Sequence, residues 1–197
     1  MNYNKIEQYI PKDSLHFIEK WFSLYSIQLR ITKDRKTKLG DYRKVNNVHQ
    51  ISINGNLNPQ AFFFVLTHEF AHLKAFEDYK HKKILAHGIE WKTTFGNLLM
   101  ESLAVYSDEI KPIIIHHAKN PRASVSADPN IAKHLINTET GVLYLEDLNF
   151  GDQFLIGQRL FEKGDKRKIR YLCTEKKSGK RYLINGLAIV NLRNEEE

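Results

Sequence analysis

The stretch from Ala61 to His72 constrains this chain more than any other. It is apolar all round until it reaches Thr67-His68-Glu69-Phe70-Ala71-His72, which contains the pattern H-E-x-x-H. A helix that is apolar on every side is normally buried, so a buried helix is predicted from Pro59 to about Tyr79. Residues four apart lie on the same face of a helix. His68 and His72 are therefore predicted to present two imidazoles to a single point.

Two histidines at this spacing suit a tetrahedral Zn²⁺ ion. Glu69 lies about 100° round the helix from His68, where it is better placed to act on a zinc-bound water than to bind the metal. It is the only Asp, Glu, Lys or Arg between Gln60 and Leu73. A buried carboxylate without a partner is costly, and a water polarised by a cation would compensate it. The sequence predicts one catalytic Zn²⁺, with Glu69 as the catalytic base.

A catalytic zinc site also needs a third protein ligand and an open position. The metzincin arrangement, with a histidine six residues after His72 and a glycine midway, is excluded because Asp78 and Ala75 occupy those positions. From the residues alone three ligand candidates stay open: Glu90, Glu101 and His87. A site closed by a fourth ligand, or a hydrolase of small substrates, also stays open. Three further histidines are expected to be exposed surface: His81, His116 and His117.

The surrounding sequence predicts an α+β fold. Residues 15–25 have helical spacing, and Ile27, Leu29 and Ile31 alternate as in a half-buried strand. Short strands are also expected at 42–45 and 51–53, and a second helix begins near Gly88. A short mixed or antiparallel sheet should therefore pack on the helix that carries the motif.

The segment from Ala118 to Asn130 contains two prolines among small and polar residues, which predicts a loop. We expect three regions: an N-terminal domain at 1–117, a linker with a short helix at 118–135, and a β-rich domain at 136–197. In the last region, short apolar clusters alternate with turn dipeptides such as Asn185-Gly186. This pattern predicts a small antiparallel sheet or barrel.

A net charge of +7 and a pI near 9.3 favour anionic partners. From Gln158 to Arg193, 11 basic residues face three acidic ones. Nucleic-acid contact is predicted on both sides of an expected turn, with Tyr171 and Tyr182 available for stacking. The candidate residues are Lys166, Arg167, Lys168, Arg170, Lys180 and Arg181. A nucleic-acid-binding protein with a weak or non-proteolytic metal site is thus the alternative function.

Cysteine content and hydropathy limit the cellular environments and the kinds of metal site that are expected. Cys173 is the only cysteine, so neither an intrachain disulfide nor a thiolate zinc cluster can form. No apolar run approaches the roughly 20 residues that cross a bilayer, and the first residues lack the apolar core of a secretory signal. We therefore expect a cytoplasmic protein with no membrane partner.

The motif, together with His87-Gly88-Ile89-Glu90-Trp91, resembles the SprT-like domain, the zinc-peptidase domain shared with Spartan-type DNA–protein crosslink proteases. The resemblance covers roughly residues 15–110 and includes Gly40-Asp41-Tyr42-Arg43 and Ile51-Ser52-Ile53-Asn54. It implies a zincin-like fold and a metallopeptidase in DNA repair, with single-stranded or damaged DNA as a partner. It also implies that His87 is the third ligand and that Glu90 is only a neighbour.

Two further expectations accompany this resemblance. Many relatives carry a four-cysteine zinc ribbon after the protease domain, and this chain has only Cys173 there, so no ribbon zinc is expected. An extended peptide substrate could pair with residues 51–54 if that strand forms the edge of the sheet beside the helix.

Overall fold

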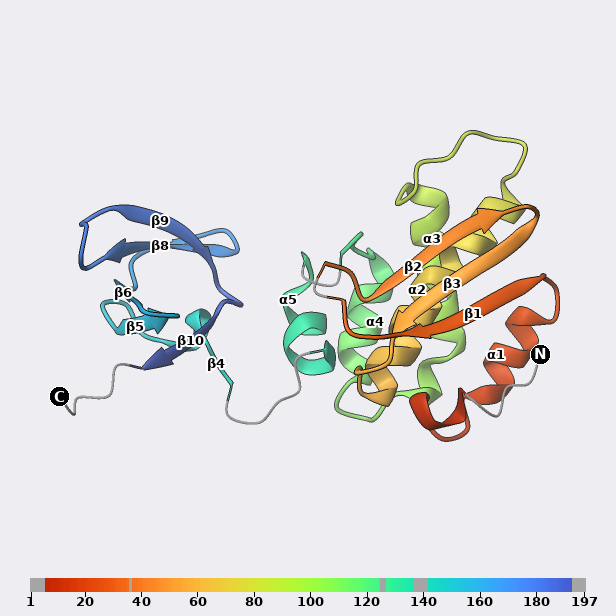
Figure 1. Ribbon diagram of the computed structural model, residues 1–197, viewed down its shortest axis with the longest axis horizontal. Coiled ribbons are helices and arrows are strands. Elements are labelled where there is room, and N and C mark those ends of the chain that lie inside the picture. Colours follow the sequence, from red (N-terminus) through yellow and green to blue (C-terminus); the bar gives the residue numbers. More distant parts are fainter. Residues whose placement is uncertain (1–5, 36, 125–126, 137–141, 193–197) are drawn as a thin grey trace. The chain divides into compact units, whose positions relative to one another are not determined.

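The computed structural model describes residues 6–35, 37–124, 127–136 and 142–192 (Figure 1). The chain forms two compact units, Met1–Asn137 and Thr138–Glu197, and each has its own hydrophobic core. The class is mixed α+β, as predicted. None of the helices in the described ranges has the length and apolar content to cross a membrane.

The N-terminal unit starts with a short 3-10 turn, η2 (Glu7–Tyr9), and helix α1 (Leu15–Phe22). A three-stranded mixed sheet follows them. Its strands are β1 (Ile27–Thr32), β2 (Gly40–Val45) and β3 (Val48–Asn54). Asn46 and Asn47 both have positive φ, of 47° and 61°, and form the tight hairpin turn between β2 and β3. β1 pairs in parallel with the other side of β3.

The strand order is therefore β1-β3-β2, with β3 in the centre. Residues 51–54 do not form an edge of this sheet, so the condition for pairing of a substrate with them is not met. Among the strands that the structure describes, β1 and β2 are the edges. Chain order alone could not show this, because β1 pairs with the second strand of the hairpin and not with the first.

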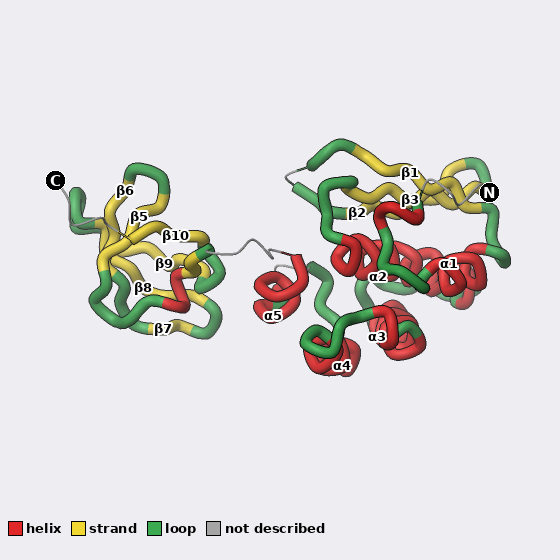
Figure 2. The backbone as a smooth tube through the Cα atoms, turned by 90° about the horizontal axis from the view of Figure 1, so that it is seen from below, coloured by secondary structure: helices red, strands yellow, loops and turns green. Residues whose placement is uncertain are grey.

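Helix α2 (Pro59–Asp78) is the centre of the unit. Asn58 begins it, since its side chain accepts a hydrogen bond from the Ala61 N–H and proline follows at the first helical position. Figure 2 shows the sheet on one side of α2 and helices α3 (Ile89–Glu101) and α4 (Lys111–Lys119) on the other. A short turn, η3 (Leu103–Val105), connects α3 toward α4. Because α2 lies between these two layers, its apolar residues from Ala61 to Leu66 are buried all round, as predicted.

The segment after α4 packs onto the N-terminal unit. It contains α5 (Pro129–Ile131) and one π-helical turn, η5 (Ala132–Ile136). Ile131 and Leu135 are 0% and 1% exposed, and both belong to the N-terminal core. The part of the expected linker from residue 127 onward thus contributes to this core. Two apolar side chains four residues apart fit the short helix that was predicted here, but they are too few to predict that the segment packs on the core.

The C-terminal unit is an antiparallel sheet of seven short strands, in agreement with the turn signals. Buried residues such as Phe154 and Phe161 form its core. Between β4 and β5 lies one 3-10 turn, η6 (Leu145–Asp147). The strands are β4 (Leu143–Tyr144), β5 (Gln153–Ile156), β6 (Arg159–Glu162), β7 (Lys166–Arg167), β8 (Arg170–Glu175), β9 (Arg181–Asn185) and β10 (Ile189–Leu192).

Candidate metal centre

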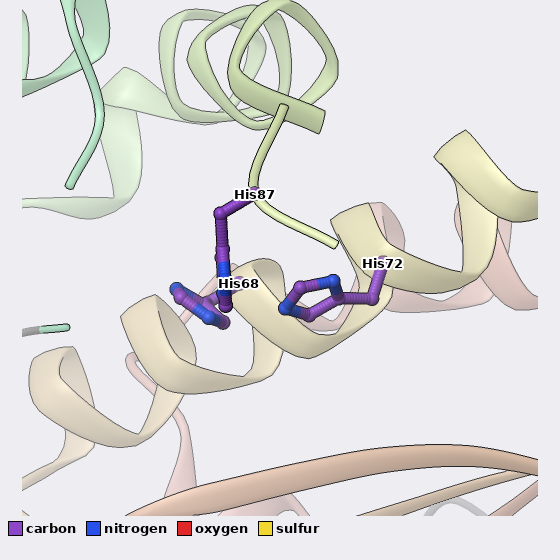
Figure 3. A group of neighbouring side chains, drawn as sticks. All are labelled: His68, His72 and His87. Atoms are coloured by element: carbon purple, nitrogen blue, oxygen red, sulfur yellow. The ribbon is translucent and has the colours of Figure 1, made fainter. Parts of the chain in front are cut away.

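Three histidines converge in the N-terminal unit. His68 and His72 project from one face of α2, and His87 reaches them from the connector that precedes α3 (Figure 3). One candidate ligand atom from each residue can be chosen so that all three lie within 4.8 Å of one another. Among the described residues, neither Glu90 nor Glu101 joins this group. Glu101 instead accepts a hydrogen bond of 2.7 Å from the Lys20 ammonium.

The donor atoms suit a tetrahedral zinc ion. Three nitrogens at zinc–nitrogen distances of about 2.0–2.1 Å would lie about 3.4 Å apart, so side-chain movements of about 1 Å would close the site. The Nε2 atom of His87 is buried without a hydrogen-bond partner. This nitrogen is therefore available to bind a metal ion. These residues therefore fit the metal that the sequence predicted.

Protonation also favours metal binding at this site. Burial, and then the neighbouring His72 and His87, lower the pKa of His68 well below its usual value. Burial lowers the pKa of His72 to about 4. Both rings are therefore neutral at pH 7, the form that binds metals. His72 also hydrogen-bonds the backbone of Ala86, and such a bond fixes which ring nitrogen remains free to bind.

Trp91 is the common neighbour of the three histidines. Its ring centroid lies 4.7 Å from those of His68 and His87 and 5.2 Å from that of His72. The residue is fully buried, and Phe95 packs against it on the same helix at 5.1 Å. The sequence pattern indicated only that Trp91 is part of the core. In the structure it also restricts the orientations of the imidazoles, which favours a preorganised site.

Glu69 lies against strand β2. A Cβ atom at Gly40 would come within 2.5 Å of its Oε1 atom, so the glycine permits this approach. The backbone N–H of Tyr42 donates a hydrogen bond to the carboxylate. Burial, and then the charge of Asp41, raise the pKa of Glu69 to about 8, while Arg35 opposes the shift. A group with a pKa near neutrality can both take up and release a proton.

A cavity of about 800 Å³ adjoins these residues. Residues 37–42, at the start of β2, line one side of it, together with the three histidines and Glu69. Its volume lies within the range typical of small-molecule and peptide sites. The candidate metal ligands are thus accessible to a substrate from one side only, because Trp91 and Phe95 fill the other side.

A hydrogen-bond network fixes the loop that leads into β2. Arg35 donates through Nε to the Asn54 side chain at 2.8 Å and through Nη1 to the Ser52 hydroxyl at 3.0 Å. The Asn54 amide nitrogen donates to the carbonyls of Arg35 and Lys38 at 3.1 and 3.2 Å. Asn54 is fully buried. This asparagine, the last residue of the motif at 51–54, therefore holds the cavity-lining loop in place.

The expectation that His117 is exposed is wrong. It is 2% exposed, and its Nδ1 atom lies 2.6 Å from Oδ2 of Asp128. Its ring contacts those of Phe64 and Phe95, at 5.4 and 5.9 Å. Burial lowers its pKa, although Asp128 opposes the shift, so the ring is neutral and donates from Nδ1. Its burial follows from helix α4, whose buried residues are Ile114 and His117. His81 and His116 are exposed, as expected.

The basic residues that were predicted to contact nucleic acid fall into two groups. The first is at the β7–β8 hairpin: Lys166, Arg167, Lys168 and Arg170. The second, Lys180 and Arg181, lies at the far end of the β8–β9 pair, since Arg181 is opposite Thr174 while Arg170 is opposite Asn185. Four residues along a strand correspond to about 13 Å. The expected single cluster across one turn is therefore not present.

The tyrosines near these cations are already in contact with other side chains. Tyr171 is only 8% exposed, and the Lys163 ammonium lies 4.1 Å from the centre of its ring. The Arg159 guanidinium lies 4.8 Å from the ring of Tyr182. Residues 138–197 as a whole carry 11 basic and 10 acidic side chains, against 19 and 13 in residues 1–137. The net charge of the C-terminal unit is thus only +1 (11 minus 10), so any strongly positive surface on it is local.

No family model, curated protein or solved structure matches this chain. The likeness to the SprT-like domain therefore rests on the motif residues alone.

Proposed function

We propose that the N-terminal unit is a zinc-dependent metallopeptidase of the SprT-like type, with one catalytic Zn²⁺ held by His68, His72 and His87. The convergence of these three side chains at the wall of an 800 Å³ cavity carries the proposal. Within the described ranges no fourth histidine, cysteine or carboxylate joins them. A three-ligand set favours a catalytic site over a closed structural one. The mixed sheet above α2 supports a zincin-like arrangement.

Bound zinc would supply the positive charge that lowers the pKa of a water molecule and polarises the scissile carbonyl. Glu69 takes a proton from the attacking water and delivers it to the leaving amine. The Tyr42 N–H orients the Glu69 carboxylate, and Gly40 leaves it the necessary space. The apolar residues beneath the histidines exclude bulk water from that side.

An extended peptide would pair with β2. This strand has only β3 as a neighbour among the described strands, and three of its residues, Gly40, Asp41 and Tyr42, line the cavity. Backbone pairing with an edge strand provides affinity with little dependence on sequence. Such a mode suits a peptidase that accepts unfolded segments of DNA-associated proteins.

The first experiment compares zinc-loaded wild type with Glu69→Gln on a denatured histone. Both proteins should contain one zinc per chain, and the variant should cleave about 10²–10⁴-fold more slowly because it lacks the proton acceptor. Glu90→Gln is the matched control, since Glu90 is a neighbouring carboxylate outside the triad, and it should retain activity. Failure of the zinc-loaded wild type to cleave any unfolded protein would exclude the peptidase function.

A second function is favoured by the β7–β8 hairpin. Arg167 and Arg170 are directly opposite each other, an arrangement that repels unless an anion lies between the side chains. Within the described part of the chain, the acid paired with them is Asp165, which lies 4.0 Å from Arg167. We propose that this hairpin contacts the phosphates of single-stranded or damaged DNA, so that the peptidase acts on DNA-associated proteins in the cytoplasm, in DNA repair.

Salt-dependent binding of an oligonucleotide tests this second function. Lys166→Glu with Lys168→Glu should weaken binding and reduce the slope of log K against log salt by about 0.7 for each phosphate that is no longer neutralised. The matched control reverses Lys180 and Arg181, which lie at the other end of β8–β9, and should have the smaller effect. Equal effects of the two double substitutions, or binding that does not depend on salt, would argue against a site at the hairpin.

A further inference from the structure

The cavity has apolar surface on both sides of the three histidines. Val65 lies one turn before His68 on α2, and Phe76 lies one turn after His72, and both line the cavity. At 1.5 Å per residue these two positions are about 16 Å apart along the helix axis. An extended peptide covers that distance in about five residues. Each apolar end therefore lies two or three residues from a bond placed at the histidines.

The end near Val65 is closed by the segment that follows α4. Ala132 and Ile136, from the π-helical turn η5, line the cavity there. The Asn58 amide donates to the Leu135 carbonyl at 2.8 Å, which places η5 beside the N-terminus of α2. Single π-type turns occur frequently at functional sites. The wall of the cavity at this end is thus built by residues remote from the motif in sequence.

This wall is firmly attached to the core. Ile131 and Leu135, on either side of Ala132, are 0% and 1% exposed. Asp128 caps the segment by accepting the N–H of Ile131 through Oδ1, while its other carboxylate oxygen bonds the buried His117 at 2.6 Å. A wall that is held in advance of binding can reject a side chain of the wrong size, because it does not move aside.

The two ends differ in openness. Phe76 is 43% exposed, and the Lys44 ammonium lies 4.9 Å from its ring centre, so the end at Phe76 faces solvent. At the other end, Ala132 is 6% exposed and presents only a methyl group to the cavity. The small side chain leaves room there for a large group of the substrate. Burial of a leucine or phenylalanine side chain in such a place is favourable.

We propose that Ala132 and Ile136 form a selectivity wall, which makes the enzyme prefer substrates with a large apolar side chain two or three residues from the cleaved bond. The inference rests on the proposed peptidase function. It assigns a role in substrate choice to the segment that follows α4 in the N-terminal unit, separate from the residues that would bind zinc or transfer protons.

Cleavage-site mapping in a random peptide library tests the wall. Zinc-loaded wild type should enrich leucine, methionine or phenylalanine at one position, two or three residues from the cut. Ala132→Phe fills the space and should lower kcat/KM for such peptides at least tenfold, with a shift to glycine, alanine or serine at that position. Ala127→Phe is the matched control, because Ala127 is an exposed alanine of the same segment outside the cavity lining.

Ile136→Ala provides a second variant in case Ala132→Phe does not fold. It enlarges the same space and should shift the preference toward tryptophan. Zinc content and circular dichroism should match wild type in each variant. Unchanged site preferences in variants that cleave would overturn the selectivity wall and leave the peptidase function standing. No cleavage by zinc-loaded wild type would overturn both.

Discussion

Gly40→Ala tests whether strand β2 positions Glu69. The new Cβ atom would lie 2.5 Å from Oε1 of Glu69, 2.8 Å from its Cγ and 2.7 Å from Cγ1 of Val65. Ordinary contacts between such atoms are about 3.5–4.0 Å, so the Glu69 side chain must move by about 1 Å. A misplacement of this size at a reacting group can lower the rate about 100-fold. We expect that decrease in kcat/KM for peptide cleavage, with zinc content unchanged.

The same substitution should have only a modest effect on stability. Overpacking costs about 1–3 kcal/mol. Replacement of glycine by alanine stabilises the protein by about 0.4–1 kcal/mol, because it reduces the conformational entropy of the unfolded chain. The net decrease in free energy of unfolding should be about 1–2 kcal/mol, which urea titration resolves. Assays at 25 °C on protein shown to be folded would therefore report the position of Glu69 and not unfolding.

Gly55→Ala is the matched control. Its Cβ atom would lie 2.8 Å from Cγ2 of Ile31, a similar overlap that does not involve Glu69. The Gly55→Ala variant should be destabilised to a similar extent, and it should still cleave peptides at the wild-type rate. Full activity in Gly40→Ala, or an equal decrease of activity in both variants, would refute the claim that the close approach of β2 positions the base.

Three further outcomes are expected. Asn54→Ala should lower the free energy of unfolding by about 2–3 kcal/mol, measured by urea denaturation, because the carbonyls of Arg35 and Lys38 would lose the amide donor of this buried side chain. The pKa of His117 is lowered by burial, so the unfolded chain takes up the proton first as the pH falls below the ordinary histidine value of 6.5. The stability of the metal-free protein should therefore decrease between pH 7.5 and 5.5, and less so in His117→Gln; equal decreases in the two proteins would contradict this. Removal of zinc by a chelator should lower the melting temperature of wild type, since a ligand at 100 times its Kd stabilises by about 2.7 kcal/mol, and should leave that of His87→Ala unchanged.

The helical part of the site could be predicted because its geometry is local. The spacing of four positions from His68 to His72 fixes both side chains on one face, and the apolar run before them fixes the burial of the first half of the helix and of His68. His87 lies beyond a connector whose path no periodicity describes. The residues alone therefore did not distinguish it from Glu90 and Glu101 as the third metal ligand. Only the resemblance to the SprT-like domain distinguished it.

Features that depend on pairing between distant segments could not be predicted. The central position of β3 follows from its parallel pairing with β1, which skips one strand. The separation of Arg170 from Arg181 follows from the register of β8 and β9. The burial of His117 depends on Asp128, which lies beyond a segment rich in proline and small residues. In each case the determining partner lies in another element and is of an ordinary residue type.

The position of β2 at the edge of the sheet, among the strands that the structure describes, has a consequence for solubility. A strand with free backbone groups can also pair with the same strand of another molecule, and this is a common route to aggregation. β2 carries Asp41, Arg43 and Lys44 among its six residues, and charged side chains on an edge discourage stacking of strands. At high protein concentration, neutralising these charges should therefore promote self-association. The strand that would bind a substrate must remain accessible to a peptide and still not pair with the same strand of another molecule.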